Sequence, residues 1–396
     1  MIRFAIPPIG GHEWFGGWMY MRNLVRSLAL YGDPQIETCV FVGGSRSQDP
    51  FIKELRVLPC TKVVVDAAFD ADRLGGGTLK TLVTGRRAAL LDSFKREGVD
   101  VALDWATYYG WRSEIPTIAW LPDFQHRALP HLFGKLAWCR REAGFRLQIA
   151  KSSKVLLSSA AAEKDCHSYY PFSRGKTHVA RFAVPVDDWP EPGDAERMLE
   201  SARIPRDFVF LPNQLWHHKN HGLAIDAASI LARRGSKRVI VATGRGSDPR
   251  RPNYRAELVN RIKETGAASN FLLLDGVEHD LVKAMMTTTN ALLNPSRFEG
   301  WSTTVEEAKA IGTPMLLSDL SVHREQAPQA RFFGLDDAEA LACSIDASPV
   351  RSRELIESSA WQARSVNEKS QMAFAQAIAE AVRQVADKAE GAKALL

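Results

Sequence analysis

Short apolar runs separated by amphipathic stretches make up the first half of the chain. The runs are continuous rather than alternating, which is typical of strands buried on both faces of a parallel sheet. The first stretch between them, residues 17–31, has the spacing of an amphipathic helix. We therefore expect a doubly wound α/β domain. Its strands are predicted over residues 3–6, 38–42, 62–65, 101–104, 117–121 and 154–158.

The same rhythm begins again after residue 200. Strands are predicted over residues 208–211, 239–243, 271–274, 291–294 and 314–318, and helices over 222–234, 254–265, 281–287 and 304–311. Two such series predict two doubly wound, Rossmann-like α/β domains. In these sheets ligands bind beyond the carboxyl ends of the strands, so we expect a ligand in a cleft that the two domains face.

The junction between the two series lies near residues 185–194, where three prolines and a glycine prevent regular structure. We therefore expect domains over residues 1–187 and 188–396. The chain closes with an alanine-rich predicted helix over 371–393, whose periodic apolar positions need a partner surface. Packing of this helix back onto the first domain is left open.

Composition narrows the class of protein. The chain has 396 residues, 45% hydrophobic and 24% charged, which suits two globular domains and excludes disorder. No run approaches the ~18–20 apolar residues of a membrane span, and the apolar stretch at residues 1–8 is too short for a secretory signal. We expect a cytoplasmic protein, with association at the inner face of a membrane left open.

Charge and cysteine content limit the partners. Lysine and arginine exceed aspartate and glutamate by 51 − 46, or +5, which suits an anionic ligand but is too small to indicate nucleic acid. The five cysteines are scattered, without CxxC spacing, so neither a disulfide framework nor a structural metal is indicated.

The segment from Asn294 to Pro314 carries the most chemistry. Thr303 stands three residues before Glu306, the spacing of a capping box, so a helix is expected to begin there. Gly300 allows close approach of the backbone. The N–H groups around this helix start suit a phosphate group. The predicted phosphate-binding residues are Gly300, Trp301, Ser302 and Thr303.

Two carboxylates flank this predicted phosphate site. Glu299 lies just before it, and Glu307 lies one turn into the predicted helix. Both would repel a phosphate unless they face its hydroxylated neighbours, since sugar and ribose hydroxyls donate well to carboxylates. The loop alone fits a capped surface helix with incidental acids equally well.

Glu299 and Glu307 are separated by seven residues in the segment that begins Phe-Glu-Gly-Trp-Ser. They resemble the EX7E motif of retaining glycosyltransferases with the GT-B fold (group 1, family 4-like). Members of that family transfer a sugar from a nucleotide-diphosphate donor. Their usual loop is Glu-Gly-Phe-Gly. Ser302 stands here in place of the second glycine, which we expect to tighten the loop. The segment 318–325 also resembles the family's segment after its next strand.

A second segment, residues 211–221, supports the resemblance. The family normally carries an arginine there and a lysine five residues on, both reaching the donor diphosphate. Lys219 matches the lysine, whereas Gln214 stands where the arginine would be. Compensation by Arg245 or Arg297 is left open. Outside this motif, Lys219 would be read as a solvated loop lysine.

The first half offers two further candidates. Gly16 and Gly17 lie between a predicted strand and helix, and the resemblance implies that they let the helix N-terminus approach the diphosphate; without it they form a flexible loop. The segment 120–130 resembles a stretch of bacterial cell-surface glycosyltransferases and implies His126 near the transferred sugar. The alternative is that His126 braces the turn at 123–127.

The resemblance implies a retaining, metal-independent hexosyltransferase of polysaccharide synthesis. Its substrates would be a nucleotide-diphosphate sugar and a saccharide or lipid-linked acceptor, with no further cofactor. Glu299, Lys219 and His126 would be catalytic. Glu307 would bind the ribose, and Gln214 and Arg245 would line the nucleotide site.

The sequence also bears on three alternative functions. A non-catalytic nucleotide-sugar-binding subunit stays open because of Gln214. The EX7E spacing argues against a nucleotide-sugar epimerase. The lack of GxGxxG after a strand argues against an NAD-dependent oxidoreductase.

Overall fold

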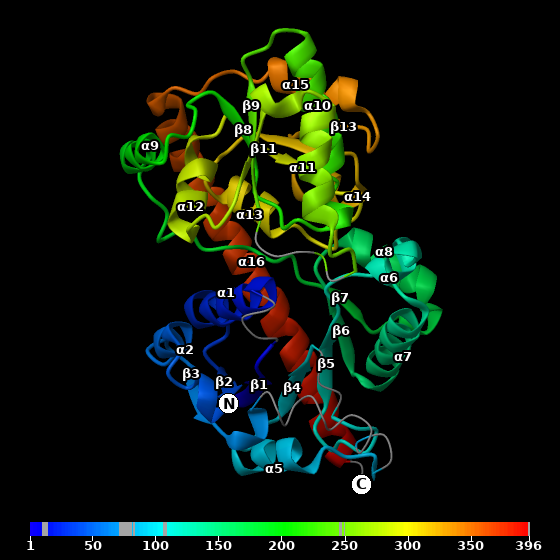
Figure 1. Ribbon diagram of the computed structural model, residues 1–396. Helices are drawn as coiled ribbons and strands as arrows, with labels where there is room; N and C mark the ends of the chain where they lie inside the picture. Colours follow the sequence, from blue (N-terminus) through cyan, green and yellow to red (C-terminus); the bar gives the residue numbers. More distant parts are fainter. Residues whose placement is uncertain are drawn as a thin grey trace. The chain divides into compact units, whose positions relative to one another are not determined.

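A computed structural model of the chain describes residues 1–9, 15–70, 81, 84–105, 109–244, 248 and 250–394. The chain divides into two compact units, each treated separately below. The first unit contains Met1–Arg127, Gly134–Ala183 and Lys369–Leu396, and the second contains Ala128–Phe133 and Val184–Glu368. Each unit is built on one parallel sheet with helices packed against it (Figure 1).

The sheet of the first unit has the strand order β3-β2-β1-β4-β5-β6-β7, with every pair parallel. The strands are β1 (Ile2–Ile6), β2 (Ile36–Val42), β3 (Thr61–Val65), β4 (Val101–Asp104), β5 (Thr117–Trp120), β6 (Lys154–Leu157) and β7 (Thr177–Val179). The accompanying helices are α1 (Phe15–Tyr31), α2 (Pro50–Leu55), α5 (Ala88–Arg96), α6 (Gln125–Ala128), α7 (Lys135–Lys151) and α8 (Ala160–Tyr169).

The sheet of the second unit has the order β10-β9-β8-β11-β12-β13, again wholly parallel. Its strands are β8 (Phe208–Leu211), β9 (Val239–Thr243), β10 (Phe271–Leu274), β11 (Ala291–Asn294), β12 (Met315–Ser318) and β13 (Arg331–Phe333). Its helices are α9 (Pro192–Ser201), α10 (His221–Arg233), α11 (Tyr254–Glu264), α12 (His279–Thr288), α13 (Thr303–Ala310), α14 (Ser321–Gln326) and α15 (Ala338–Asp346).

Strand β8 shows why these strands are apolar at every position. Successive side chains of a strand point to opposite faces. Phe208 and Phe210 enter one core cluster, which includes residues of α12 and α13, and Val209 and Leu211 enter another, which includes residues of α10. Because helices cover both faces, neither set of side chains meets water. The two parallel α/β sheets confirm the predicted fold class.

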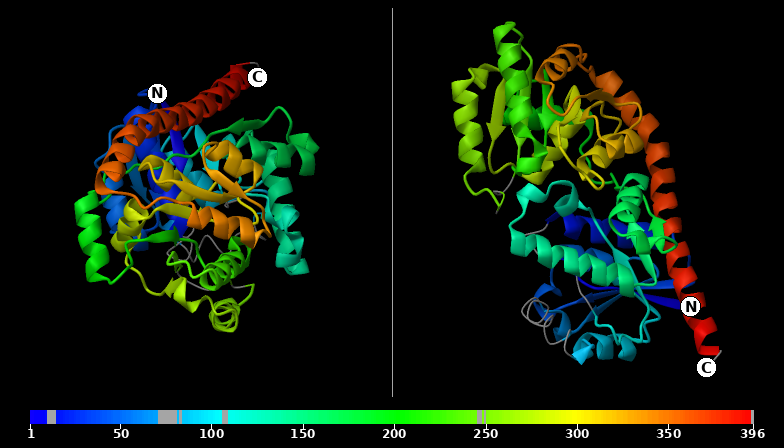
Figure 2. Two further views of the ribbon diagram at one scale, coloured as in Figure 1. Left: turned by 90° about the horizontal axis from the view of Figure 1, so that it is seen from above. Right: turned by 90° about the vertical axis from the view of Figure 1, so that its right-hand side faces the viewer.

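The last helix, α16 (Arg353–Ala394), is continuous and begins well before the expected residue 371 (Figure 2). From residue 369 its residues belong to the first unit. There Phe374, Ile378 and Val382 recur at four-residue intervals and are at most 1% exposed. The Phe374 ring lies 6.1 Å from that of Tyr20. This helix therefore completes the core of the first unit.

Within the described part of the chain, no helix combines the length and the apolarity needed to cross a bilayer.

Truncating Phe374 tests this arrangement. We expect Phe374→Ala to lower the free energy of unfolding of the first unit by about 3–5 kcal/mol, because a large buried ring leaves a cavity. Trp361→Ala on the same helix is the control: Trp361 is 77% exposed, so a change within about 0.5 kcal/mol is expected. Urea unfolding with amide hydrogen exchange of α1 measures both variants. Equal losses would contradict the role given to α16.

Candidate functional site

The polar residues predicted for the second unit gather where three neighbouring strands end. Strand β11 pairs with β8 on one side and with β12 on the other. Because all three strands are parallel, the segments that follow them emerge at the same edge of the sheet. The strand order also reverses at β8, between β9 and β11. This is the switch point at which doubly wound sheets bind ligands.

Lys219 and Glu299, 80 residues apart in sequence, form an ion pair at this edge. Lys219 Nζ lies 2.6 Å from Glu299 Oε1. Lys219 ends a short 3-10 helix, His217–Lys219, and the next residue, Asn220, has a left-handed conformation (φ 57°) that turns the chain into α10. The backbone N–H of Arg297 donates to the carbonyl oxygen of His218 (2.8 Å), which joins the two loops.

The Lys219–Glu299 pair is largely shielded from water, with side chains 17% and 9% exposed. Burial alone would raise the pKa of Glu299, but above all the charge of Lys219 and its hydrogen bond lower it to about 2. Glu299 is therefore ionised at neutral pH, and the pair places a fixed cation beside the end of β11.

His323 is a member of this cluster that the sequence did not single out. It lies on α14, is fully buried, and its Nδ1–H donates to the carbonyl oxygen of Ser318 (2.9 Å). Its Nε2 has no hydrogen-bond partner among the described residues. Burial lowers the pKa of His323, so the ring is neutral even though Glu299 acts in the opposite direction. The only sequence signal was its place within the segment 318–325.

The expected helix start at residue 303 is confirmed, but the expected capping box is wrong. Ser302 is the N-cap residue, and Thr303 is the first helical residue of α13. The Glu306 carboxylate does not return to the N-cap backbone; it accepts from Lys309 Nζ (2.8 Å) and Gln326 Nε2 (2.9 Å). The reason is that the N-cap is Ser302, one residue earlier than expected, so Val305 and not Glu306 stands at the N3 position that a capping box requires. The N–H of Ser302 is instead bonded to Gln326 Oε1 (3.1 Å).

Not all the predicted phosphate donors are therefore available. The N–H of Ser302 is bonded to Gln326, whereas those of Thr303 and Thr304 meet no acceptor within the described ranges. Gly300 lies buried in the loop, and the Trp301 ring lies 5.8 Å from Lys309 Nζ. An anion at this helix N-terminus would meet the donors of the first turn of α13.

The second EX7E carboxylate has a different environment from the first. Glu307 lies on α13, half-buried, and its carboxylate has no hydrogen bond or ion pair in the part of the chain that the structure describes. Burial raises the pKa of Glu307 to about 7, although the charge of Lys283 acts against this rise. The carboxylate is thus an acceptor without a donor.

Gln214 stands at the family's arginine position, and Arg245 and Arg297 are the two arginines that could replace that charge. Gln214 is exposed, and its backbone carbonyl oxygen accepts from the N–H of Trp216 (2.7 Å). Arg297 forms an ion pair with Asp336. Arg245 lies outside the described residues. Compensation of Gln214 by Arg245 or Arg297 stays open.

In the first unit, Gly16 and Gly17 belong to the first turn of α1, because this helix begins at Phe15. The expectation that they precede the helix is wrong. Gly16 is exposed and Gly17 is buried. They lie at a helix N-terminus, and the neighbouring glycines at residues 10 and 11 lie outside the described residues.

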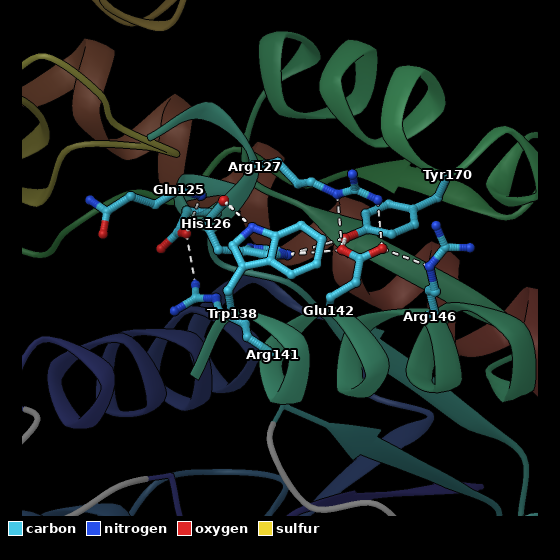
Figure 3. A network of polar contacts seen from close by, with 9 residues as sticks. Gln125, His126, Arg127, Trp138, Arg141, Glu142, Arg146 and Tyr170 are labelled. Carbon is cyan, nitrogen blue, oxygen red and sulfur yellow. Dashed lines mark hydrogen bonds and ion pairs between the residues drawn. The ribbon is translucent and has the colours of Figure 1, made fainter. Parts of the chain in front are cut away.

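His126 lies at the centre of a buried polar network in the first unit (Figure 3). It is fully buried, and its Nε2–H lies 3.2 Å from Glu142 Oε2. The Glu142 carboxylate also accepts from Arg127, Arg146 and the Tyr170 hydroxyl, at 2.6 to 2.9 Å. Figure 3 shows these side chains converging on Glu142 from α6, α7 and the segment after α8.

The network ties His126 to the local structure. Burial would raise the pKa of Glu142, but hydrogen bonds from Tyr170, Arg146 and Arg127 lower it to about 2. Trp138 Nε1 also donates to the His126 carbonyl oxygen (2.7 Å). This geometry fits the bracing role; the catalytic role of His126 stays a prediction.

Among the residues with described positions, no three His, Cys, Asp or Glu side chains gather as a metal ion requires. Metal independence stays a prediction.

Comparison with known proteins agrees with this geometry. Residues 198–347 match the family model described as "Glycosyl transferases group 1". A D-inositol 3-phosphate glycosyltransferase of Jonesia denitrificans is 24% identical over 184 residues. The match covers 44% of this chain and 42% of the relative, so it spans less than half of that curated protein.

Solved structures are similar over nearly the whole chain. A glycosyltransferase of Rickettsia africae has a TM-score of 0.62 at 14% identity, covering 98% of this chain and 97% of its own. Anabaena HepE, solved with UDP and glucose, has a TM-score of 0.62 at 15% identity, covering 98% and 99%. These likenesses show the GT-B fold. The resemblance to group 1 glycosyltransferases read from the motifs is confirmed by the family match.

The Glu142 network predicts a loss of stability in acid. The pKa of Glu142 lies below its ordinary value, so its contribution is complete above about pH 5 and is lost as the pH falls toward about 2. We expect the free energy of unfolding of the first unit to fall by about 3 kcal/mol over this range, because the lowered pKa of Glu142 corresponds to a contribution of that size. Glu142→Gln should remove this dependence, as measured by hydrogen exchange of α7 between pH 6 and 3.

Two results would count against this assignment. One is a variant that loses stability in acid as steeply as the wild-type protein. The other is His126→Ala with an unchanged melting temperature, since a histidine that braces this network cannot be removed without cost.

Proposed function

We propose that this protein is a retaining glycosyltransferase that moves a sugar from a nucleotide-diphosphate donor to a saccharide or lipid-linked saccharide in cell-surface polysaccharide synthesis. The observation that carries the proposal is the Lys219–Glu299 ion pair beside the N-terminus of α13, where β8 and β11 end. A cation, a carboxylate and backbone N–H groups stand together at the edge where such sheets bind ligands.

Different residues of the candidate site suit different parts of the nucleotide-sugar donor. The N–H groups at the start of α13 and the Lys219 ammonium suit the diphosphate. The unpartnered carboxylate of Glu307 suits the two ribose hydroxyls, which are donors. Glu299 uses only Oε1 for Lys219, so its second oxygen is assigned to a hydroxyl of the transferred sugar.

In the proposed reaction, the bond between the anomeric carbon and the phosphate oxygen breaks as the acceptor hydroxyl attacks from the same face. The departing phosphate oxygen takes the proton of that hydroxyl. Negative charge grows on the diphosphate as it leaves, and Lys219 with the α13 N–H groups stabilises it without reorganisation. These groups supply positive charge where other enzymes use a metal ion, so we propose a metal-independent reaction in the cytoplasm.

The similarity to Anabaena HepE, solved with UDP and glucose, favours UDP as the first nucleotide to test. A non-catalytic nucleotide-sugar-binding subunit remains the second candidate, because the exposed Gln214 replaces the family's arginine.

A two-step experiment tests the proposal. A thermal-shift screen against UDP, GDP, ADP and their sugars identifies the donor, since a bound ligand raises apparent stability. Nucleotide diphosphate released from that donor is then measured with and without saccharide and lipid-linked acceptors. Acceptor-dependent release supports the transferase. Binding without release supports the binding subunit, and no binding at all would exclude both functions.

Glu307 predicts how donor binding depends on pH. Its pKa of about 7 means that the carboxylate form, the better acceptor for ribose hydroxyls, forms between pH 6 and 8. We expect the affinity for UDP-glucose, whose phosphates do not titrate there, to rise about tenfold over this interval. Calorimetry measures it. Glu307→Gln should bind more weakly at pH 8 and with no such slope; a flat wild-type profile would remove Glu307 from the site.

Lys219 predicts a separation of turnover from binding. Lys219→Met should lower turnover by about 10²–10³, the scale seen when one preorganised oxyanion donor is removed. Donor affinity should fall much less, because the charge on the diphosphate is greatest in the transition state. Lys62→Met is the control, since Lys62 pairs with Glu97 at the same 2.6 Å outside the site. Near-normal turnover in Lys219→Met would reassign the role.

A further inference from the structure

The side-chain amide of Gln326 holds the start of α13 by three hydrogen bonds. Its Oε1 accepts from the N–H of Ser302 (3.1 Å). Its Nε2 donates to the carbonyl oxygen of Ser302 (2.7 Å) and to Glu306 Oε1 (2.9 Å). Gln326 lies at the end of α14 and is only 2% exposed. One buried amide therefore fixes both backbone groups of the N-cap residue.

Ser302 is held by a second amide from another element. Asn294, the last residue of β11, donates from Nδ2 to Ser302 Oγ (2.9 Å). Asn294 Oδ1 in turn accepts from Ser296 Oγ (2.7 Å) and Asn213 Nδ2 (3.2 Å). Ser302 and Asn294 are nearly or fully buried. The N-cap residue is thus clamped between β11 and α14.

Only an amide side chain suits the position of Gln326. The backbone of Ser302 presents one donor and one acceptor, and Glu306 presents a further acceptor. A primary amide has one oxygen acceptor and two N–H donors, so it satisfies all three groups. A carboxylate could accept from Ser302 but could donate nothing. An apolar side chain would leave the buried N–H of Ser302 without a partner, whereas the Ser302 carbonyl oxygen would keep its bond from the N–H of Glu306 and the Glu306 carboxylate would keep its bond from Lys309.

The hydrogen bonds from Gln326 and Asn294 to Ser302, called the clamp below, determine which backbone N–H groups at the start of α13 are available to a ligand. With the N–H of Ser302 taken, the N–H groups of Thr303 and Thr304 are among the donors of the first turn that meet no acceptor in the described structure. N–H groups at a helix start point outward along its axis, so the orientation of Ser302 sets their aim.

We propose that Gln326 is a positioning residue for the donor diphosphate: by clamping Ser302 it aims the N–H groups of Thr303 and Thr304 at the phosphates. The proposal rests on the proposed function of this site. The opposite possibility is a blocking role, in which Gln326 would compete with the ligand for the N–H of Ser302. The two roles predict opposite changes in diphosphate affinity when Gln326 is replaced. Removing a positioning group weakens diphosphate binding, whereas removing a blocking group strengthens it.

The test compares UDP with uridine, because only UDP carries the phosphates that the clamp would serve. The quantity measured is the ratio of the two affinities, by calorimetry, for the wild-type protein and for Gln326→Met, which is close in volume. We expect the ratio to fall about tenfold, with uridine binding changed less than twofold. If the screen selects GDP, then GDP and guanosine replace this pair.

Asn270→Leu is the matched control. Asn270 is a buried amide of the second unit that also makes three hydrogen bonds, to Ser236, Arg238 and Ser269. It lies next to the start of β10, at the opposite end of the sheet from the site. Both variants should lower the melting temperature similarly, but only Gln326→Met should change the ratio. A general loss of stability would move both ratios or neither.

The possible results distinguish a failure of the positioning role of Gln326 from a failure of the proposed function on which it rests. An unchanged or increased ratio in a folded Gln326→Met overturns the positioning role. If that variant does not fold, Gln326→Glu keeps the side-chain length and the bond to the N–H of Ser302 while losing both donated bonds. It should lower the ratio at least about threefold, and an unchanged ratio again overturns the role. A wild-type protein that binds UDP no better than uridine contradicts the proposed function itself.

Discussion

The candidate site depends on one constraint, the parallel pairing of β8 with β11. Parallel neighbours end at the same edge, so the loops after them meet although 80 residues separate Lys219 from Glu299. The ion pair between these residues costs desolvation, which a short contact and further hydrogen bonds must offset. It places a positive charge near the start of α13, where the helix dipole has the same sign. Because Glu299 is ionised the pair as a whole is neutral, and the donors that this edge offers a phosphate are the Lys219 ammonium and the N–H groups of α13.

Three buried or half-buried carboxylates show how environment assigns different tasks to one functional group. Glu299 and Glu142 both have a pKa of about 2, the former through a lysine and the latter through arginine and tyrosine hydrogen bonds. Glu307 has a pKa of about 7 because it is buried without a donor. Glu142 stabilises the first unit by accepting hydrogen bonds from residues of α6, α7 and the segment after α8. A strongly lowered pKa is therefore not in itself a sign of function.

The sequence predicted those parts of the fold whose signal is local. Strand β8 is apolar throughout and β11 is apolar up to its last residue, Asn294, because both faces are covered, and both strands were predicted to the residue. Strands β7 and β13 were missed because each has only three residues, mostly half-buried or exposed, and leaves no apolar run. Helix α7 was missed since it buries Glu142 and exposes Leu136, the reverse of an amphipathic pattern.

The site was predicted to a similar extent. Glu299, Lys219 and the helix start followed from motifs, because their spacing along the chain is fixed. Gln326 and His323 were not found, since each acts through partners distant in sequence and looks like an ordinary polar residue of a short helix. The capping box failed because the N-cap is Ser302 rather than Thr303, which places Val305 instead of Glu306 at the N3 position.

The path of α16 has a consequence for how the protein is made. The core of the first unit includes Phe374 and its neighbours, which the ribosome produces only after the whole of the second unit. The second unit, apart from six residues, is one uninterrupted stretch, Val184–Glu368. Domains usually acquire structure in order of synthesis. Here the order is inverted: all residues of the second unit are made before the first unit is complete, and the first must wait, with part of its apolar core uncovered, until α16 has been made. The earlier-made half is thus the one most exposed to chaperones and to aggregation.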